Sequence, residues 1–340
     1  MTSDRVLLAH GSGGRMMHEL IGRVFLPALT SGYPGLGSED SAVLTLPAHL
    51  GCRIAITTDS YVVSPAFFPG GNIGDLSVNG TVNDLAMSGA IPLYITAGFI
   101  VEEGFLFTGL EAVVRSMRQA ADIAGVSIVA GDTKVVDRGK ADGIFINTAG
   151  VGIVPDGINI SASGLLPGDR IIVSGTLGDH GMAVMSIREG LSFGSDIRTD
   201  SAPLNSLVRD MLAVCPEVHA FRDPTRGGLA ATLNEFAASS NVGVVIDESA
   251  VPVTDAVRGA CELLGLDPMY VANEGKLVAS VPAGRADAVL KAMRANPYGK
   301  DAAIIGEVIE DHPGKALIKT LIGGTRFLDM PAGEILPRIC

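Results

Sequence analysis

The sequence is poor in the residues that build redox and zinc sites. It has no tryptophan, only 5% aromatic residues and four cysteines among 340 residues. The cysteines are Cys52, Cys215, Cys261 and Cys340, and no two of them have the close spacing of a zinc module or a dithiol redox motif. We therefore expect reduced thiols, three of them serving as small packing residues and one standing at the last position.

Positive charge is also scarce. Lysine and arginine total 25 against 37 aspartate and glutamate residues, which leaves a net charge of −12. This balance excludes the basic surface that binds nucleic acid or an anionic membrane. The uncharged segment 85–101 is interrupted by Pro92, so it predicts a helix, a turn and a strand rather than a membrane span. Because the N-terminus has no signal-peptide pattern, we expect a cytoplasmic protein.

The length and the hydrophobic pattern predict two α+β domains between an arm and a tail. We expect a glycine-rich arm at 1–42, one domain at 43–155, a second at 156–330, and an extended, mobile tail at 331–340. The arm holds a helix predicted at 17–29. The first domain has strands predicted at 41–46, 53–57, 93–99, 126–130 and 143–154, and helices at 72–88 and 109–124. The second has strands predicted at 170–174, 242–246, 276–281 and 303–308, and helices that end at Arg188, begin near Ala202 and Leu229, and span 284–295.

Acidic residues after apolar runs take the place of the familiar glycine-rich nucleotide signatures, which are absent. Asp59 follows the run 54–58, and Asp132 follows 128–131. If these residues end their strands, their carboxylates point into a shared space, where oxygen ligands can hold Mg²⁺ beside a phosphate. Further acids in comparable positions are Asp40, Asp75 and Asp84. The alternative is that each acid is a solvated turn residue.

Three loops add groups that could act on a phosphate or a proton. Thr133 and Lys134 follow Asp132, and the lysine could neutralise a polyphosphate or a developing oxyanion, unless it is only a surface residue after a tight turn. Residues 222–228 precede a predicted helix, where free N–H groups suit an anion, although glycines also serve an ordinary helix start. Glu274 stands just before a strand and is a candidate general base.

Cys340 is the most specific feature, because it is the last residue of a tail that contains Pro331 and Pro337. A thiol at the tip of such a tail can enter one pocket and then reach another protein. Sulfur is a good nucleophile and an acyl–sulfur bond is reactive, so the thiol suits a covalent carrier of a small group. The alternative is an inert, exposed terminal residue.

Together these residues resemble one family over essentially the whole chain. The matching segments are 9–14 (AHGSGG), 39–42 (EDSA), 57–60 (TTDS), 78–87 (VNGTVNDLAM), 131–134 (GDTK), 223–228 (DPTRGG), 273–275 (NEG) and 337–340 (PRIC). They are similar to the HypE family of carbamoyl dehydratases, within the aminoimidazole ribonucleotide synthetase-like superfamily of ATP-using enzymes. The internal segments are typical of the superfamily, and the terminal PRIC singles out the family.

The resemblance implies a two-domain α+β fold in which the N-terminal sheet pairs with that of a second copy, so that a homodimer closes a β-barrel. Mg²⁺ and ATP bind between the domains, and the flexible tail carries the reacting group. A HypF carbamoyltransferase loads a carbamoyl group onto Cys340. ATP-dependent dehydration then converts it to a thiocyanate, and the cyano group passes to iron on a HypC–HypD scaffold during maturation of nickel–iron hydrogenase.

The resemblance also implies roles for individual residues. The magnesium ligands are expected to be Asp40, Asp59, Asp84 and Asp132. The nucleotide is expected to contact Asn83, Asp84, Asp132, Thr133, Asp223, Gly227 and Gly228. Lys134 is expected to stabilise the carbamoyl oxygen, Glu274 to take the nitrogen proton, and Cys340 to carry the group.

Two other functions are compatible with the same residues. Another member of the superfamily, such as selenide, water dikinase or thiamine-monophosphate kinase, would use the acids on a free small molecule and would not need Cys340. A non-catalytic maturation scaffold would use the tail only for docking. Lys134 and the run of acids weigh against the scaffold, because docking alone gives no reason for them.

Overall fold

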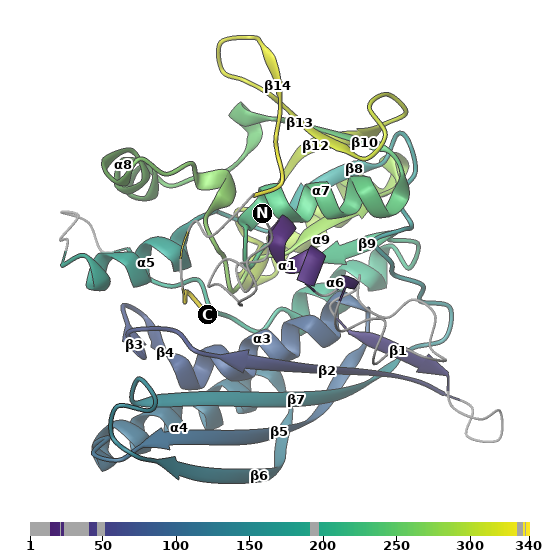
Figure 1. The fold of residues 1–340 in the computed structure, drawn as a ribbon. Helices are drawn as coiled ribbons and strands as arrows, with labels where there is room; N and C mark the ends of the chain where they lie inside the picture. Colours follow the sequence, from purple (N-terminus) through teal and green to yellow (C-terminus); the bar gives the residue numbers. More distant parts are fainter. Residues whose placement is uncertain are drawn as a thin grey trace.

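Two β-sheets, one in each half of the chain, organise the protein (Figure 1). The computed structural model describes residues 14–20, 22–23, 41–45, 52–190, 197–331, 336 and 338–340. The expected ligand Asp40 and most of the arm lie outside these residues. The described part of the arm contains helix α1 (Arg15–Leu20), where the longer helix 17–29 was predicted.

The N-terminal sheet has five strands and mixed pairing. Its order is β1 (Ala42–Thr45), β2 (Arg53–Tyr61), β7 (Ile144–Val154), β5 (Ile91–Glu102) and β6 (Ser127–Val136). Only β5 and β6 run parallel, since a helix connects them, whereas the other neighbours are antiparallel. Side chains of β7 alternate between buried and more exposed, as expected of a sheet covered on one face. In the described residues this sheet stays open and closes no barrel.

Helices α3 (Ile73–Met87) and α4 (Phe107–Ala124) cover one face of this sheet. Asn72 caps α3, and the Asp75 side chain accepts a hydrogen bond from the Asn72 backbone N–H, which completes a capping box. Almost every residue of α3 is buried, because the helix lies between the sheet and the C-terminal half (Figure 1). α3 is therefore the element through which the two halves meet.

The C-terminal sheet has seven strands between two helical layers. Its order is β14 (Thr325–Phe327), β13 (Lys315–Lys319), β10 (Gly243–Asp247), β12 (Ala303–Ile309), β8 (Arg170–Val173), β11 (Val278–Val281) and β9 (Ala220–Arg222). Helix α7 (Gly228–Ser240) packs on one face, and α6 (Asn205–Val214) and α9 (Ala286–Ala295) pack on the other. Smaller elements are β3 (Phe67–Phe68), β4 (Gly71–Asn72), α5 (Asp179–Arg188), α8 (Asp255–Leu264) and 3₁₀ turns at Glu248–Ala250, Pro268–Tyr270, Ala283–Arg285 and Pro297–Gly299.

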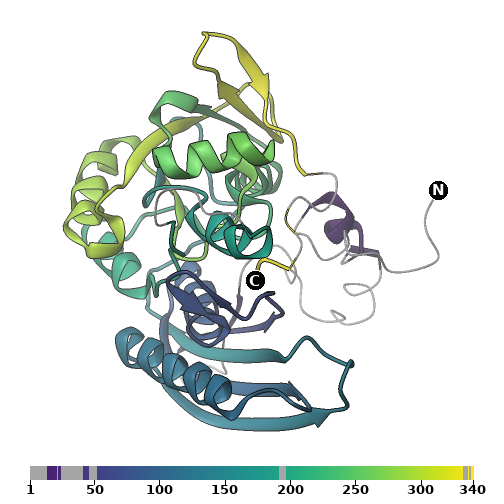
Figure 2. The same cartoon turned by 90° about the vertical axis from the view of Figure 1, so that its left-hand side faces the viewer.

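The C-terminus lies between the two halves in both ribbon views (Figures 1 and 2). The β13–β14 hairpin projects on the opposite side of the C-terminal half, where its tip carries the highly exposed Ile322. Among the described residues, no helix is both long enough and apolar enough to cross a membrane.

The structure confirms most predicted elements and corrects two of them in a way that matters for the site. β2 and β6 run on past the predicted ends at residues 57 and 130, because each pairs along its length with a longer neighbour, β7 or β5. Asp59 and Asp132 therefore lie inside strands, and the prediction that they end their strands was wrong. The pattern also missed β9, α8, β13 and β14.

Candidate active site

The last three residues lie against the segment that follows β2. The Val62 N–H donates to a main-chain carboxylate oxygen of Cys340, the last residue, at 3.1 Å, and the Ser64 N–H donates to the Arg338 carbonyl at 3.3 Å. Between them, the Ile339 side chain is buried in the apolar cluster of the N-terminal half. The Arg338 guanidinium pairs with Asp142 and stacks over Phe145. The carrier cysteine predicted from the sequence is thus held at the junction of the halves.

Four acidic side chains from different elements gather near the C-terminus, where Asp59, Asp223 and Glu274 act on the Cys340 thiol and Asp84 acts on the neighbouring Arg226. Asp59 stands on β2, Asp84 on α3, Asp223 just after β9, and Glu274 in the loop before β11. Two of the carboxylates accept hydrogen bonds: the Tyr61 hydroxyl donates to Asp59 at 3.2 Å, and Thr57 Oγ1 donates to Asp84 at 2.7 Å. The structure therefore brings together four of the predicted acids, although their segments are far apart in the chain.

These acids carry more negative charge than their surroundings offset. Burial and the charges of Asp223 and Asp200 raise the pKa of Glu274 well above its ordinary value. Burial, with the charge of Asp59, likewise raises the pKa of Asp223 to about 6. Burial raises the pKa of the half-buried Cys340 thiol to about 12, and the charges of Glu274, Asp59 and Asp223 add to that rise. We call the space among Asp59, Asp84, Asp223, Glu274 and Arg226 the acid pocket. It holds a neutral thiol and favours any positive charge that enters it.

Arg226 lowers the pKa of the Cys340 thiol and of Glu274, and sequence reasoning did not assign it a role. The pKa of Arg226 would be raised most by a negative charge on Cys340, and the charges of Asp59 and Glu274 also raise it. Its side chain is exposed, and no described residue accepts a hydrogen bond from its guanidinium. Its position in the segment 223–228 was the available signal, since a cation directly before two glycines at a helix start suits an anion. Arg226 is thus available to a ligand.

Glu274 is fixed by its backbone while its carboxylate stays open. The Glu274 N–H donates to Asp200 Oδ1 at 3.0 Å, and the Glu274 carbonyl accepts from Asn83 Nδ2 at 3.2 Å. Asp200 is itself paired with Lys276 at 3.1 Å. Glu274 Oε1 is buried and has no hydrogen-bond partner among the described residues. A buried acceptor without a partner is costly, so this oxygen is suited to a group that the ligand brings.

Asn83 supports this loop rather than presenting a free amide. Its Nδ2 atom donates to Ala202 and Glu274 carbonyls, and its Oδ1 accepts from the Leu204 N–H at 2.8 Å. Every polar hydrogen of the amide is therefore engaged within the chain. The expected contact of Asn83 with a nucleotide stays a prediction.

The glycines before α7 have a backbone reason to be glycine. Gly227 and Gly228 adopt φ values of 80° and 61°, a region that other residues rarely occupy. A Cβ on Gly228 would also lie 2.7 Å from the Val271 carbonyl oxygen. This packing brings the start of α7 close to residues 269–271, and the expected contact of both glycines with phosphate stays a prediction.

The segment 132–134 does not join the pocket of its own chain. Lys134 Nζ lies 2.6 Å from Asp132 Oδ2, and this pairing lowers the pKa of the exposed Asp132. The strand registers align Asp132 with Ser60 through β5 and β7, so Asp132 lies three strands from β2 and on the opposite face from Asp59. Three strand spacings amount to about 14 Å. Asp132, Thr133 and Lys134 are therefore separated from Asp59, Asp84 and Glu274.

The acid group fits a hard divalent cation, and the expected ligand set stays a prediction. Among residues that the structure describes, no cluster of three or more candidate ligands is preformed. Mg²⁺ needs only one or two carboxylates when phosphates and water complete its shell. Asp59 and Asp84 can supply these, and the excess negative charge around Glu274 and Asp223 favours a cation there.

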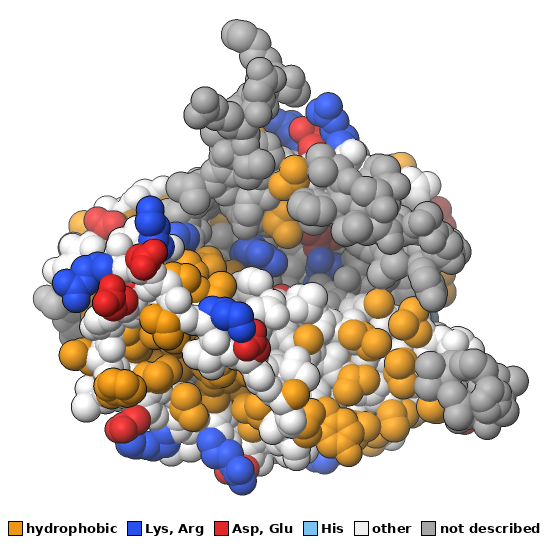
Figure 3. Space-filling model, turned by 60° about the horizontal axis from the view of Figure 1, so that its bottom comes forward, with side chains coloured by type: hydrophobic (Ala, Val, Ile, Leu, Met, Phe, Trp, Pro, Cys, Tyr) orange, Lys and Arg blue, Asp and Glu red, His pale blue; other side chains and the backbone are white. Residues whose placement is uncertain are grey.

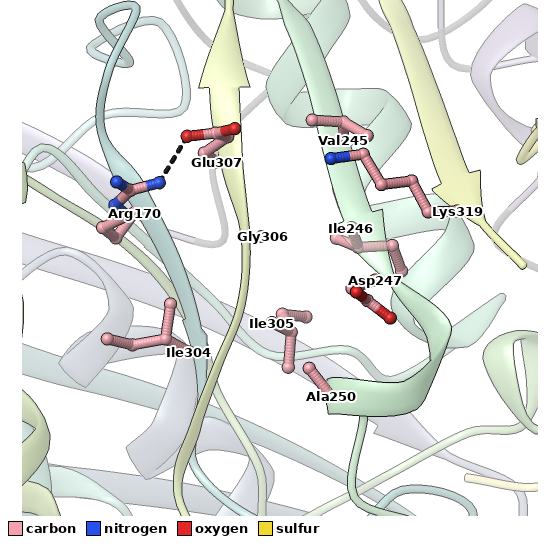
Figure 4. Close-up of a pocket in the computed structure, with 10 residues that line it drawn as sticks. All are labelled: Arg170, Val245, Ile246, Asp247, Ala250, Ile304, Ile305, Gly306, Glu307 and Lys319. Atoms are coloured by element: carbon pink, nitrogen blue, oxygen red, sulfur yellow. Dashed lines mark hydrogen bonds and ion pairs between the residues drawn. The ribbon is translucent and has the colours of Figure 1, made fainter. Parts of the chain in front are cut away.

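A separate cleft of about 180 Å³ lies on the C-terminal sheet and contains none of the predicted residues. It is lined by Arg170, Val245, Ile246, Asp247, Ala250, Ile304, Ile305, Gly306, Glu307 and Lys319 (Figure 4). Arg170 and Glu307 pair with one another across adjacent strands. The cleft has no unusual chemistry and is not the candidate site.

Comparison with known proteins identifies the family of this chain. Residues 38–154 match the family model "AIR synthase related protein, N-terminal domain", and residues 167–319 match the corresponding C-terminal domain. A carbamoyl dehydratase HypE from Cupriavidus necator is 55% identical over 338 residues, which cover 99% of this chain and 95% of the relative. The chain belongs to the HypE family of carbamoyl dehydratases.

Solved structures of HypE proteins have the same fold. A HypE in complex with ATP is 47% identical, with a TM-score of 0.83, and the match covers 99% of this chain and 100% of that one. The HypE of a HypE–HypF complex is 48% identical, with a TM-score of 0.86, over 92% of this chain and 99% of that one. The two-domain fold implied by the resemblance is confirmed.

The raised pKa of Asp223 predicts a stability gain from removing its charge. Asp223 is ionised in both the folded and the unfolded protein above pH 6, and it is protonated in both below about pH 4. Its charge therefore lowers the free energy of unfolding by the full amount only above pH 6. Asp223→Asn should raise the free energy of unfolding by roughly 2–3 kcal/mol at pH 7, and this gain should disappear as the pH falls to 4. Urea unfolding from pH 4 to 8 measures it.

The matched control is Asp311→Asn, because Asp311 is exposed. It should change stability little at any pH. A loss of stability in Asp223→Asn at pH 7 would contradict the assigned excess of negative charge.

Proposed function

We propose that this protein dehydrates a carbamoyl group carried on the Cys340 thiol to a thiocyanate at the expense of ATP. In this way it would supply the cyanide ligands for the iron of nickel–iron hydrogenase. The observation that carries the proposal is the position of the C-terminal thiol, which lies among Asp59, Asp223, Glu274 and Arg226 at the junction of the halves. Membership of the HypE family and the ATP complex of a close relative support it.

Dehydration of the carbamoyl group requires that its oxygen become a better leaving group and that both N–H protons be removed. The carbamoyl oxygen attacks the γ-phosphorus of ATP, and ADP departs with the electrons of the broken P–O bond. Loss of one N–H proton leaves an intermediate whose carbon is bonded to the Cys340 sulfur, to the phosphorylated oxygen and, by a double bond, to N–H. Loss of the second N–H proton forms the C≡N bond while phosphate departs with the C–O bonding electrons. The products are the thiocyanate, ADP and inorganic phosphate.

Glu274 is the candidate proton acceptor. Its raised pKa makes it a stronger base than an ordinary carboxylate, and its Oε1 has no described partner to compete for the proton. The backbone contacts with Asp200 and Asn83 hold it in place. Arg226 is suited to neutralise charge on the phosphorylated oxygen, because its guanidinium has no described acceptor and already faces Cys340.

Asp59 and Asp84 are the residues of the described chain that would hold Mg²⁺, with Asp40 as a proposed third ligand. The ion, when bound, offsets the charge of the triphosphate and of the transferred phosphoryl group. The proposed nucleotide contacts are Asp223, Gly227, Gly228 and Asn83.

We infer a homodimer from the uncovered face of the N-terminal sheet. Figure 3 shows hydrophobic side chains gathered on this side of the molecule. Ile56, Ile91, Tyr94, Ile100 and Ile153 are each between 40% and 55% exposed, and the strand registers place them on the face away from α3 and α4. So large an apolar surface favours a partner, and a second copy would close the β-barrel expected of the family.

Such a dimer would give Asp132, Thr133 and Lys134 a place in the reaction. Asp132 and Lys134 share the uncovered face, as the pairing of Gly98 with Asp132 and Ile100 with Lys134 indicates. They cannot reach the pocket of their own chain, but a second copy on that face could receive them. Lys134 would then stabilise the carbamoyl oxygen in the partner's pocket.

The tail must also meet other proteins. The solved HypE–HypF complex of a relative supports HypF as a partner. We propose that HypF donates the carbamoyl group and that the cyano group passes to a HypC–HypD scaffold. Both transfers need Cys340 outside the pocket, so we propose a flexible tail at 331–340 beyond domains at 43–155 and 156–330 and an arm at 1–42. A kinase of free small molecules would need no thiol inside the acid pocket.

Replacing Glu274 tests the proton acceptor. After Cys340 is carbamoylated with cyanate and Mg–ATP is added, Glu274→Gln should slow formation of the nitrile at least about 100-fold, because the amide cannot take the proton. An assay of released ADP follows the phosphoryl transfer, and infrared detection of the nitrile follows the elimination of phosphate. The exposed Glu262→Gln should react like the parent. Nitrile formation at the parental rate in Glu274→Gln would contradict the role.

Mixing two inactive variants tests whether the pocket is shared between copies. Lys134→Ala and Glu274→Gln chains, mixed equally and allowed to exchange subunits, should regain about a quarter of the parental activity, since half of the dimers are mixed and each has one intact site. Subunit composition is checked by native mass spectrometry. Mixed dimers that remain as inactive as the separate variants would place both residues in one chain and overturn the shared pocket.

A further inference from the structure

Helix α5 turns two polar side chains toward the tail. His180 and Arg188 are eight positions apart, so they lie on one face of the helix with Val184 between them. We propose that His180 and Arg188 are positioning residues, which hold the main chain of the tail so that the Cys340 thiol stays in the acid pocket. The inference rests on the proposed function only in that the tail is the carrier.

His180 is buried and makes a hydrogen bond with each ring nitrogen. Nε2 lies 2.9 Å from the Ile339 carbonyl oxygen, and Nδ1 lies 2.7 Å from Thr199 Oγ1. A carbonyl can only accept, so Nε2 carries the proton, and we assign the donor role of the second bond to the Thr199 hydroxyl. The Ser201 N–H donates in turn to Thr199 Oγ1 at 3.0 Å. This chain fixes the tautomer that donates to the tail.

Arg188 joins the tail to the segment beside it. Its Nη2 donates to the Arg338 carbonyl at 2.9 Å, and its Nε donates to the Ser64 carbonyl at 3.0 Å. The Ser64 N–H donates to the same Arg338 carbonyl. One guanidinium therefore holds together the two chain segments whose pairing places the last residue.

The contact surface between His180 and Arg188 is apolar. Val184 packs in the same cluster as the buried Ile339 side chain. Gly181, one residue beyond His180, lets Leu336 approach, since a Cβ there would lie 3.2 Å from Leu336 Cδ1. The face of α5 thus receives Ile339 and Leu336 and satisfies the carbonyls of two consecutive tail residues.

The polar contacts of His180 and Arg188 with the tail are made to backbone carbonyls and not to the Cys340 side chain. A modification at the Cys340 sulfur leaves the Arg338 and Ile339 carbonyls unchanged. The same two side chains can therefore hold the tail whether the thiol is free or carries a group. Because each bond can be broken and remade, the tail can still leave for a partner, and its docked fraction depends on α5.

Alkylation of the Cys340 thiol by N-ethylmaleimide measures that fraction without ATP or a carbamoyl group. The docked thiol is shielded, so the rate follows the undocked population. His180→Ala should raise the rate for the C-terminal peptide about ten-fold, because a buried carbonyl loses its donor. Arg188→Gln should raise it by a similar factor. His180→Gln, which keeps a donor at a comparable reach, should stay within about three-fold of the parent.

Two controls separate docking from a general loss of structure. Ile187→Ala changes an exposed residue of the same helix and should leave the rate unchanged. Cys215 and Cys261 are buried in the C-terminal half and should stay protected in every variant. Alkylation of Cys340 at the parental rate in both His180→Ala and Arg188→Gln would overturn the proposal. An equal rise in the alkylation rates of Cys215 and Cys261 in both variants would also overturn it. Failure of this test would leave the dehydration chemistry unaffected.

Discussion

The gathering of four buried or half-buried carboxylates beside Arg226 is the constraint on which the rest of the structure depends. Asp59, Asp84, Asp223 and Glu274 come from four elements, and Arg226 is the cation that faces them. Like charges in a partly buried space raise one another's pKa and disfavour the folded state. A protein keeps such an arrangement when a ligand offsets the charge, as a magnesium–nucleotide complex with a positively charged metal does. The repulsion among these carboxylates therefore indicates that the site binds a ligand that offsets their charge.

The two sheets serve this pocket in different ways. The N-terminal sheet and α3 present Asp59 and Asp84, and the C-terminal half presents Asp223, Arg226 and Glu274 through loops that precede α7 and β11. Asn83 on α3 binds the carbonyl of Glu274 and so ties the halves together at the site. The tail then docks along the same junction, held by α5 and by the segment after β2. Docking of the tail brings the reacting group to the site on the protein's own chain. Catalysis on such a tethered group therefore requires no separate substrate-binding step.

The sequence alone predicted most of the elements and the membership of the acid group. Period-two and period-3.6 patterns identified α3, α4 and the long strands, because each buries one regular face. It could not show that Asp132 and Asp59 lie on opposite faces, since strand order and register are set by pairing between distant segments. His180 and Arg188 gave no motif, because they contact backbone carbonyls, which every sequence possesses. Arg226 stood in a recognised segment, but its importance comes from the acids that the fold gathers around it.

The mass of the C-terminal peptide tests the central claim most directly. The chain would be carbamoylated at Cys340 with cyanate, incubated with and without Mg–ATP, digested and weighed, with Cys340→Ala treated in parallel. We expect the adduct to lose the mass of one water only when ATP is present, and the Cys340→Ala peptide to show neither adduct nor loss. Consumption of ATP with an unchanged adduct would contradict the proposed dehydration.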